Sequence, residues 1–188
     1  VSLDGTRFFY VNPLEVEPRL KDKEYEKHRL AYEREKWLVC ACCPPNLARL
    51  TASIGNYAYS VGTDTFYSHL YLGGEAQAQL DGKAVKVCTQ SNYPWDEEIK
   101  VTFHCEPAKF KYAIRIPGWC ENYQLFLNGD PVEGQVREGY AYFDRVWKEG
   151  DTITAKFEMP VLMVEANPRV RKDLGKVAVT RGPLVYCL

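Results

Sequence analysis

The sequence predicts a mainly β protein, an antiparallel and jelly-roll-like β-sandwich that follows a short helical part. Three observations carry this prediction. Short strand-like segments recur after Tyr57, turn-forming dipeptides separate them, and aromatic residues, which suit β-sheet cores, make up 13% of the chain. With 46% hydrophobic and 26% charged residues among 188, the chain is globular and long enough to bury a sizeable core.

Before Tyr57 the pattern is different. Residues 6–14 are expected to be extended, and residues 21–36, rich in Lys, Glu and Arg without a clear apolar stripe, form either a solvated helix or a loop. A helix is predicted from Pro45 to about Asn56. Prolines suit its entry and first turn, and apolar side chains follow at helical spacing at Leu47, Leu50 and Ile54.

The strand-like segments after Tyr57 predict the sandwich. They are residues 66–72, 75–80, 83–90, 98–104, 111–116, 123–127, 140–146 and 151–157. Asp81-Gly82 and Asn128-Gly129 predict hairpin turns, because both dipeptides tolerate positive φ.

After Pro160 the rhythm changes, and two more strand-like segments, residues 161–165 and 176–188, indicate a further β unit that the chain begins and does not finish. The predicted domains are therefore 1–57, 58–160 and 161–188. Val1 is not an initiator methionine and the chain stops at Leu188 within an apolar run, so we expect a segment of a longer protein.

The net charge and the cysteine content indicate which classes of partner and which cellular compartment to expect. A formal net charge of −1 gives no reason to expect nucleic acid or an anionic membrane surface, and leaves neutral ligands open. No apolar run reaches the roughly 20 residues of a membrane span. The cysteines are odd in number and follow no regular framework, which favours a reducing, cytoplasmic location: Cys40, Cys42, Cys43, Cys88, Cys105, Cys120 and Cys187.

Three of these thiols fall within four positions, immediately before the predicted helix. The amide N–H groups and the dipole at a helix N-terminus favour a thiolate, the form that attacks carbon or binds a metal. Zinc tolerates such close spacing, but a complete site needs four ligands and no further CxxC or HxxxH pair supplies them. The alternative is that these cysteines are small core residues.

Aromatic and histidine side chains give weaker indications. The Tyr10 hydroxyl is a candidate to hydrogen-bond a sugar, although an ordinary half-buried strand tyrosine explains it as well. Trp95 either stacks on a sugar ring or covers one end of the sandwich. The three histidines have no spacing typical of a dyad or a metal pair, and no role is assigned to His28, His69 or His104.

The string Trp-Leu-Val-Cys-Ala-Cys-Cys-Pro-Pro-Asn-Leu-Ala-Arg at residues 37–49 closely resembles the signature of glycoside hydrolase family 127, the β-L-arabinofuranosidases. Three other stretches are similar to segments of this family. They are Ser-Leu-Asp-Gly at 2–5 with Phe-Phe-Tyr-Val-Asn-Pro-Leu at 8–14, Tyr-Pro-Trp-Asp at 93–96, and Val-Thr-Arg-Gly-Pro-Leu-Val-Tyr at 179–186.

The resemblance implies a parent enzyme with an (α/α)6 catalytic barrel followed by β-sandwich domains, with residues 1–57 as the last part of the barrel. It implies a retaining glycoside hydrolase that releases β-L-arabinofuranose or a similar sugar. Cys42 corresponds to the nucleophile and a zinc ligand, and Cys43 to a second zinc ligand. Cys40 is left as a structural thiol.

The resemblance also implies that half of the site is missing from this chain. The glutamate that serves as acid and base, and the remaining zinc ligands, lie upstream in the family, so no residue here takes those roles. The nearby carboxylates are instead expected to be solvated: Glu15, Glu17, Glu24 and Glu26. We therefore expect this chain to be inactive without the rest of the parent polypeptide.

Two other functions remain open from the residues alone. The sandwich is compatible with a non-catalytic carbohydrate-binding or structural module, since sandwich folds serve many functions. The cysteine cluster is compatible with a zinc-stabilised structural domain. The partners expected for this chain are a small carbohydrate substrate and the remainder of the parent polypeptide, and neither nucleic acid nor a membrane.

Overall fold

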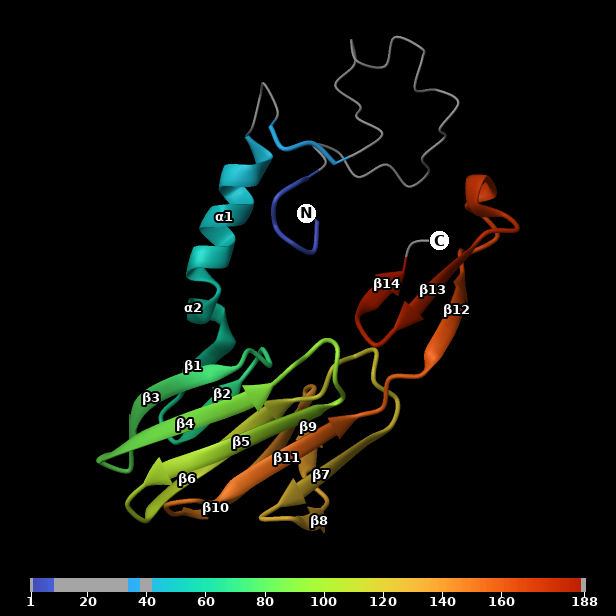
Figure 1. The fold of residues 1–188 in the computed structure, drawn as a ribbon. Helices are drawn as coiled ribbons and strands as arrows, with labels where there is room; N and C mark the ends of the chain where they lie inside the picture. Colours follow the sequence, from blue (N-terminus) through green and yellow to red (C-terminus); the bar gives the residue numbers. More distant parts are fainter. Residues whose placement is uncertain (1, 9–33, 38–41, 187–188) are drawn as a thin grey trace. The chain divides into compact units, whose positions relative to one another are not determined.

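The computed structural model describes residues 2–8, 34–37 and 42–186. Contacts divide the chain into two compact units, Val1–Gly55 and Asn56–Leu188 (Figure 1). No helix within the described ranges is long and apolar enough to cross a membrane. The predicted domain limits, 1–57, 58–160 and 161–188, remain predictions.

The first unit contains helix α1, Cys43–Ser53. Pro44 and Pro45 occupy its first turn, where a missing N–H costs nothing and the fixed φ of proline suits the helix. The observed helix thus begins two residues before the predicted start at Pro45. It also ends before the predicted end at about Asn56, and a separate short helix α2, Gly55–Ala58, follows. Most of the expected extended and charged segments, 6–14 and 21–36, lies outside the described residues.

The second unit is built on two β-sheets that form the layers of a sandwich (Figure 1). The five-stranded sheet has the order β1 (Tyr59–Val61), β2 (Thr65–Ser68), β6 (Ala108–Arg115), β10 (Tyr140–Trp147) and β9 (Gln135–Arg137). The six-stranded sheet has the order β3 (Gly74–Leu80), β4 (Lys83–Ser91), β5 (Glu98–Cys105), β11 (Thr152–Phe157), β7 (Tyr123–Leu127) and β8 (Asp130–Val132).

The strand pairings are antiparallel except for β2 and β6, which run parallel. This confirms the predicted mainly β, antiparallel sandwich. Three strands were not predicted, β1, β8 and β9, and each has only three residues. So short a segment shows no clear alternation, and its position in the sheet comes from the long strand beside it.

Two predicted hairpin turns are confirmed. Asp81 and Gly82 have φ of 53° and 68°, and Asn128 and Gly129 have φ of 52° and 91°. Positive φ at both central residues matches the right-handed twist of the flanking strands. A third dipeptide of this kind, Glu138-Gly139, joins β9 to β10 and was not predicted, since glutamate seldom adopts positive φ.

Aromatic residues fill the space between the two sheets. Trp147 is fully buried and stacks on Phe103 with ring centroids 4.1 Å apart. Polar groups carried by the buried rings are hydrogen-bonded: Trp147 Nε1 donates to the Phe110 carbonyl at 3.1 Å, and the Tyr112 hydroxyl donates to Ser68 Oγ at 2.8 Å. These buried rings, with their polar groups paired in this way, form part of the core of the sandwich.

A three-stranded sheet follows the sandwich, formed by β12 (Val161–Glu165), β13 (Val177–Arg181) and β14 (Leu184–Tyr186). It confirms the strands predicted at 161–165 and 176–188, the latter being a hairpin that turns at Gly182. That glycine has φ of 55°, and a Cβ there would lie 2.9 Å from the Met159 sulfur. Only glycine fits this turn without a shift of its neighbours.

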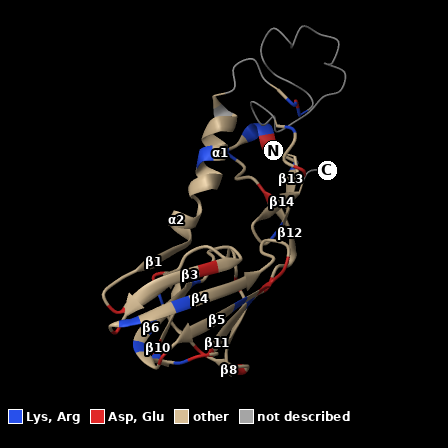
Figure 2. Cartoon of the chain, turned by 60° about the vertical axis from the view of Figure 1, so that its left-hand side comes forward, with Lys and Arg blue, Asp and Glu red and all other residues tan. Residues whose placement is uncertain are grey.

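Charged side chains of both signs are interspersed over the strands, and neither sign gathers on one sheet (Figure 2). Several are paired across neighbouring strands, such as Lys86 with Glu75 at 3.2 Å and Lys156 with Glu98 at 3.3 Å. The distribution agrees with the net charge of −1 in offering no extended field of one sign.

Candidate functional site

The two cysteines predicted to carry the chemistry lie where α1 begins. Cys42 is the N-cap residue, with φ of −74° and ψ of −30°, and Cys43 is the first residue of the helix. The side chain of Cys42 is exposed. The pair therefore sits at the positive end of the helix dipole, as the prolines after it predict.

Two side chains of α1 hold the turn that carries Cys42. Asn46 Nδ2 donates a hydrogen bond of 2.8 Å to the main-chain carbonyl of Cys42. Arg49 in turn donates from its guanidinium to Asn46 Oδ1. Asn46 and Arg49 belong to the string that resembles the family signature, yet sequence reasoning gave them no role. The signal was the spacing of four residues from Cys42 to Asn46 and of three from Asn46 to Arg49, which places these side chains on one side of the helix.

The prolines change one part of the prediction. The first turn of a helix ordinarily offers several unpaired amide N–H groups to an anion, but Pro44 and Pro45 have none. Fewer backbone donors thus remain at this end of α1 than a general helix N-terminus provides. The dipole still favours a thiolate here, while the hydrogen-bonding part of the expected stabilisation is smaller.

The donor chemistry of the pair fits zinc, which prefers thiolate ligands and accepts neighbouring cysteines. The described residues bring no group of three or more His, Cys, Asp or Glu side chains together in metal-binding geometry. A four-coordinate site on this pair therefore needs donors from beyond the described residues.

Several predicted residues lie outside the described ranges. They are Tyr10, Cys40, His28 and the four carboxylates Glu15, Glu17, Glu24 and Glu26. Their roles stay as predicted.

The cysteines of the sandwich have an ordinary structural environment. Cys105 and Cys120 are buried, and burial raises the pKa of both thiols. The Cys88 thiol donates to Glu75 Oε1 at 3.1 Å, and this hydrogen bond raises its pKa as well. A raised pKa makes the thiolate less available, so these environments disfavour a nucleophilic or metal-binding role for the three thiols.

The strings at 93–96 and 179–186 meet at one joint. Arg181, at the end of β13, donates to the Trp95 carbonyl at 2.9 Å and lies 3.5 Å from Glu97 Oε1. The same Glu97 oxygen accepts from the Met159 amide at 3.1 Å. Sequence reasoning treated the strings as separate signals, whereas the structure gives them a shared role in attaching the three-stranded sheet to the sandwich.

Two histidines without a predicted role are hydrogen-bonded within the sandwich. His69 connects Ser60 Oγ, 2.7 Å from its Nε2, to the Tyr140 hydroxyl, 2.8 Å from its Nδ1. His104 Nδ1 lies 2.6 Å from Glu149 Oε1. These contacts connect the segment after β2 to β1 and β10, and β5 to the loop between β10 and β11.

Comparison with known families covers almost the entire chain. Residues 1–56 match the family model of the GH127 β-L-arabinofuranosidase catalytic domain, residues 65–159 that of the GH127 β-L-arabinofuranosidase middle domain, and residues 161–188 that of the glycoside hydrolase family 127 C-terminal domain.

Known relatives agree with these matches. The chain is 39% identical to a non-reducing end β-L-arabinofuranosidase of Bifidobacterium longum subsp. longum, and it spans 29% of that protein's length. It resembles the crystal structure of a GH127 β-L-arabinofuranosidase from Geobacillus stearothermophilus T6 (TM-score 0.88, 46% identity), covering 98% of this chain and 29% of that one. A solved GH127 β-arabinofuranosidase gives a TM-score of 0.83 at 36% identity, covering 100% of this chain and 30% of that one. The chain therefore belongs to glycoside hydrolase family 127.

Proposed function

We propose that this chain supplies the nucleophile of a retaining glycoside hydrolase that releases β-L-arabinofuranose from glycans. Cys42 is the nucleophile and a zinc ligand, Cys43 is a second zinc ligand, and Tyr10 contacts the sugar. The observation that carries the proposal is the exposed Cys42 thiol at the N-terminus of α1, in a segment matched by the GH127 catalytic-domain model.

The reaction proceeds in two displacements. In the first, the Cys42 thiolate attacks the anomeric carbon, the glycosidic C–O bond breaks, and the leaving oxygen takes a proton from the acid residue of the parent protein. In the second, water attacks the same carbon and gives a proton to that residue, and the C–S bond breaks to restore the thiolate. Two inversions at one carbon retain its configuration.

The proposed metal contributes to the state of the thiol. Zinc, when bound, keeps a coordinated cysteine deprotonated at neutral pH. Two residues of this chain position Cys42. The Asn46 side chain fixes the Cys42 carbonyl, and Arg49 orients the Asn46 amide. The turn that presents the thiol is thereby held independently of any ligand.

The proposal is tested in the whole parent protein with Cys42→Ala, Cys43→Ala and, as a matched control, Cys88→Ala in the sandwich. Hydrolysis of an aryl β-L-arabinofuranoside and zinc content are measured together. Cys42→Ala is expected to lower kcat by about a thousandfold or more, because the covalent route is closed. Both α1 variants are expected to lower zinc content, and Cys88→Ala is expected to keep activity and zinc.

An external nucleophile separates catalysis from a purely structural zinc site. Azide added to Cys42→Ala is expected to restore turnover and to give an arabinofuranosyl azide of inverted configuration, since a small anion then occupies the position of the missing sulfur. Full activity in Cys42→Ala contradicts the proposal. Loss of zinc and of melting temperature in this variant, with no response to azide, supports a structural zinc domain instead.

A further inference from the structure

The six-stranded sheet carries an open groove at its β8 edge. Its volume is about 710 Å³, within the range of about 300–1,000 Å³ that small-molecule sites occupy. Strands β7 and β8 and the segment after them form its walls, with side chains that include those of Tyr123, Gln124, Phe126, Pro131 and Glu133. No part of the proposed thiol chemistry uses this groove.

The local fold explains why the groove has a polar and an aromatic side. Gln124 and Phe126 alternate with the buried Leu125 along β7, so both face away from the core. Phe126 pairs with Pro131 across the ladder. Gly134 closes the end, where a Cβ would lie 3.0 Å from the Ala141 Cβ, so its backbone stays close to the core and adds no side chain to the groove.

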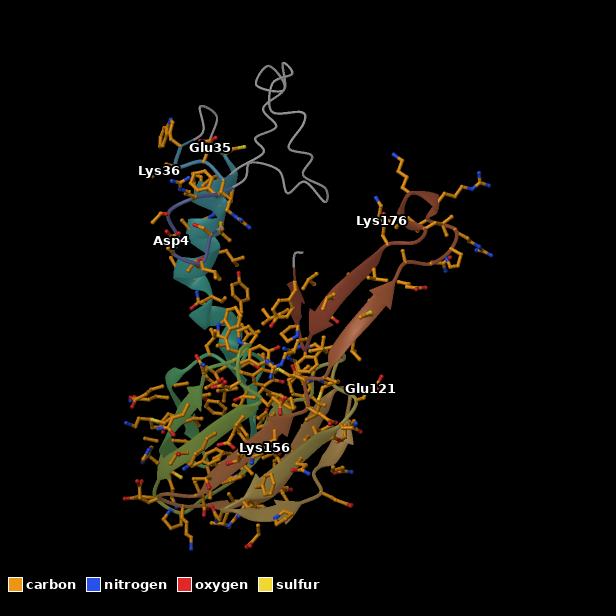
Figure 3. All side chains as sticks on the ribbon, turned by 45° about the vertical axis from the view of Figure 1, so that its right-hand side comes forward. Asp4, Glu35, Lys36, Glu121, Lys156 and Lys176 are labelled. Carbon is orange, nitrogen blue, oxygen red and sulfur yellow. The ribbon has the colours of Figure 1, made fainter. Side chains whose placement is uncertain are left out.

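Charged and polar side chains lie near the Phe126 ring. Lys156 Nζ lies 5.6 Å from the ring centroid and is paired with Glu98 at 3.3 Å on the neighbouring strand. Lys156 projects from β11 of the same sheet (Figure 3). The exposed side chains of Gln124 and Glu133 add an amide and a carboxylate. An aromatic ring beside such groups suits a sugar, whose C–H face stacks on the ring and whose hydroxyls need donors and acceptors.

Two other classes of partner fit less well. A peptide that adds a strand to the sheet needs a free edge, but β8 has three residues, and Pro131 within it has no N–H to donate. A polyanion needs clustered positive charge, whereas Lys156 is neutralised by Glu98 and Glu133 adds a negative charge to the lining. A small, neutral and hydroxyl-rich ligand meets neither obstacle.

We propose that this groove is a secondary carbohydrate-binding site for a neutral arabinose-containing oligosaccharide. The choice of arabinose as the sugar rests on the function proposed above, the release of β-L-arabinofuranose. In this site Phe126 stacks on a sugar ring, and Gln124 and Glu133 hydrogen-bond its hydroxyls.

The test is a titration of the isotope-labelled 188-residue chain with L-arabinotriose, followed by amide NMR shifts. Shifts are expected at β7, β8 and residues 133–134, with saturation transfer from the ring protons of Phe126. Gln124→Ala and Phe126→Leu are expected to weaken binding by about tenfold, through lost hydrogen bonds and stacking. Gln77→Ala, an exposed glutamine on the opposite edge strand β3, is the matched control and is expected to bind as the unchanged chain does.

No shift at these residues at millimolar sugar, or equal weakening by Gln124→Ala and Gln77→Ala, overturns the proposal. Retained dispersion of the amide spectrum shows that each variant is folded. Because the titration measures binding without turnover, its failure leaves the role of Cys42 untouched. If the sugar binds in the groove but Cys42 proves unreactive, the proposed catalytic function fails and the proposed carbohydrate-binding site stands.

Discussion

Cys42 owes its presentation to neighbours that perform no chemistry themselves. The Asn46 amide holds the Cys42 carbonyl, and Arg49 holds the amide. The residue types of the cysteine pair favour reactive or metal-binding thiols, since neighbouring cysteines rarely serve packing alone, and this role stays a prediction. The positioning role of Asn46 and Arg49 was not predictable in the same way, because a polar side chain on a helix is ordinarily solvated.

At the same scale, His69 gives a prediction about pH. Burial, and then the positive charge of Arg115, lower the pKa of this imidazole below its usual 6.5. The folded state therefore favours neutral His69, and stability is fully present above pH 6.5 and falls as the pH drops below it. An NMR titration of the His69 ring is expected to give a midpoint below 6.5. A midpoint at or above 6.5 contradicts this.

A matched variant separates the hydrogen bonds of His69 from its charge. His69→Gln keeps a donor and an acceptor for Ser60 and Tyr140 and does not titrate in this range. Urea unfolding is expected to show a shallower loss of stability between pH 7 and pH 5 in His69→Gln than in the unchanged chain. If the unfolding free energy depends on pH identically in His69→Gln and in the unchanged chain, a group other than His69 causes the loss of stability.

At the scale of elements, the hairpin between β7 and β8 rests on Asn128. This residue has positive φ, its Nδ2 donates to the buried Asp151 at 2.9 Å, and its Oδ1 accepts from the Thr152 amide at 2.7 Å. Asn128→Gly keeps the backbone freedom and loses both bonds, and we expect a cost of about 1–3 kcal/mol. Asn128→Ala adds backbone strain of about 1–2 kcal/mol.

Urea denaturation of the 188-residue chain measures both values. The predicted order is unchanged chain, then Asn128→Gly, then Asn128→Ala in falling stability. Asn128→Ala at least as stable as Asn128→Gly would falsify the role given to positive φ in this turn.

The long strands were predictable because apolar and aromatic residues recur between turn signals, as at β5, β10 and β11. Strands β1, β8 and β9 were not, since their pairing partners, and not their own three residues, determine them. The register and the division of strands between two sheets depend on contacts distant in sequence. The joint at Arg181 is of this kind, linking residues 86 positions apart.

At the scale of the whole molecule, this joint attaches the three-stranded sheet to the sandwich. Arg181→Met keeps the apolar stem and removes the donors to the Trp95 carbonyl and Glu97. We expect the local opening free energy of residues 161–186 to fall by about 1–2 kcal/mol, while the sandwich core stays protected. Hydrogen exchange measures this, with the exposed Arg171→Met as matched control. Unchanged exchange in Arg181→Met, or an equal effect of Arg171→Met, argues against the joint.

The proposed catalytic site is only partly present in the described residues. The cysteine pair was located from sequence and lies at a helix N-terminus as predicted, whereas the acid residue and further zinc ligands were expected to lie beyond this chain. The chain spans 29% of the curated relative that it matches.

The central claim is that Cys42 forms the covalent bond to the sugar. The most direct measurement treats the zinc-loaded parent protein with a covalent arabinofuranoside inhibitor, then determines the intact mass and maps the modified residue by peptide mass spectrometry. The account predicts one added group per chain, attached to the Cys42 sulfur, and none in Cys42→Ala. A label on any other residue contradicts it.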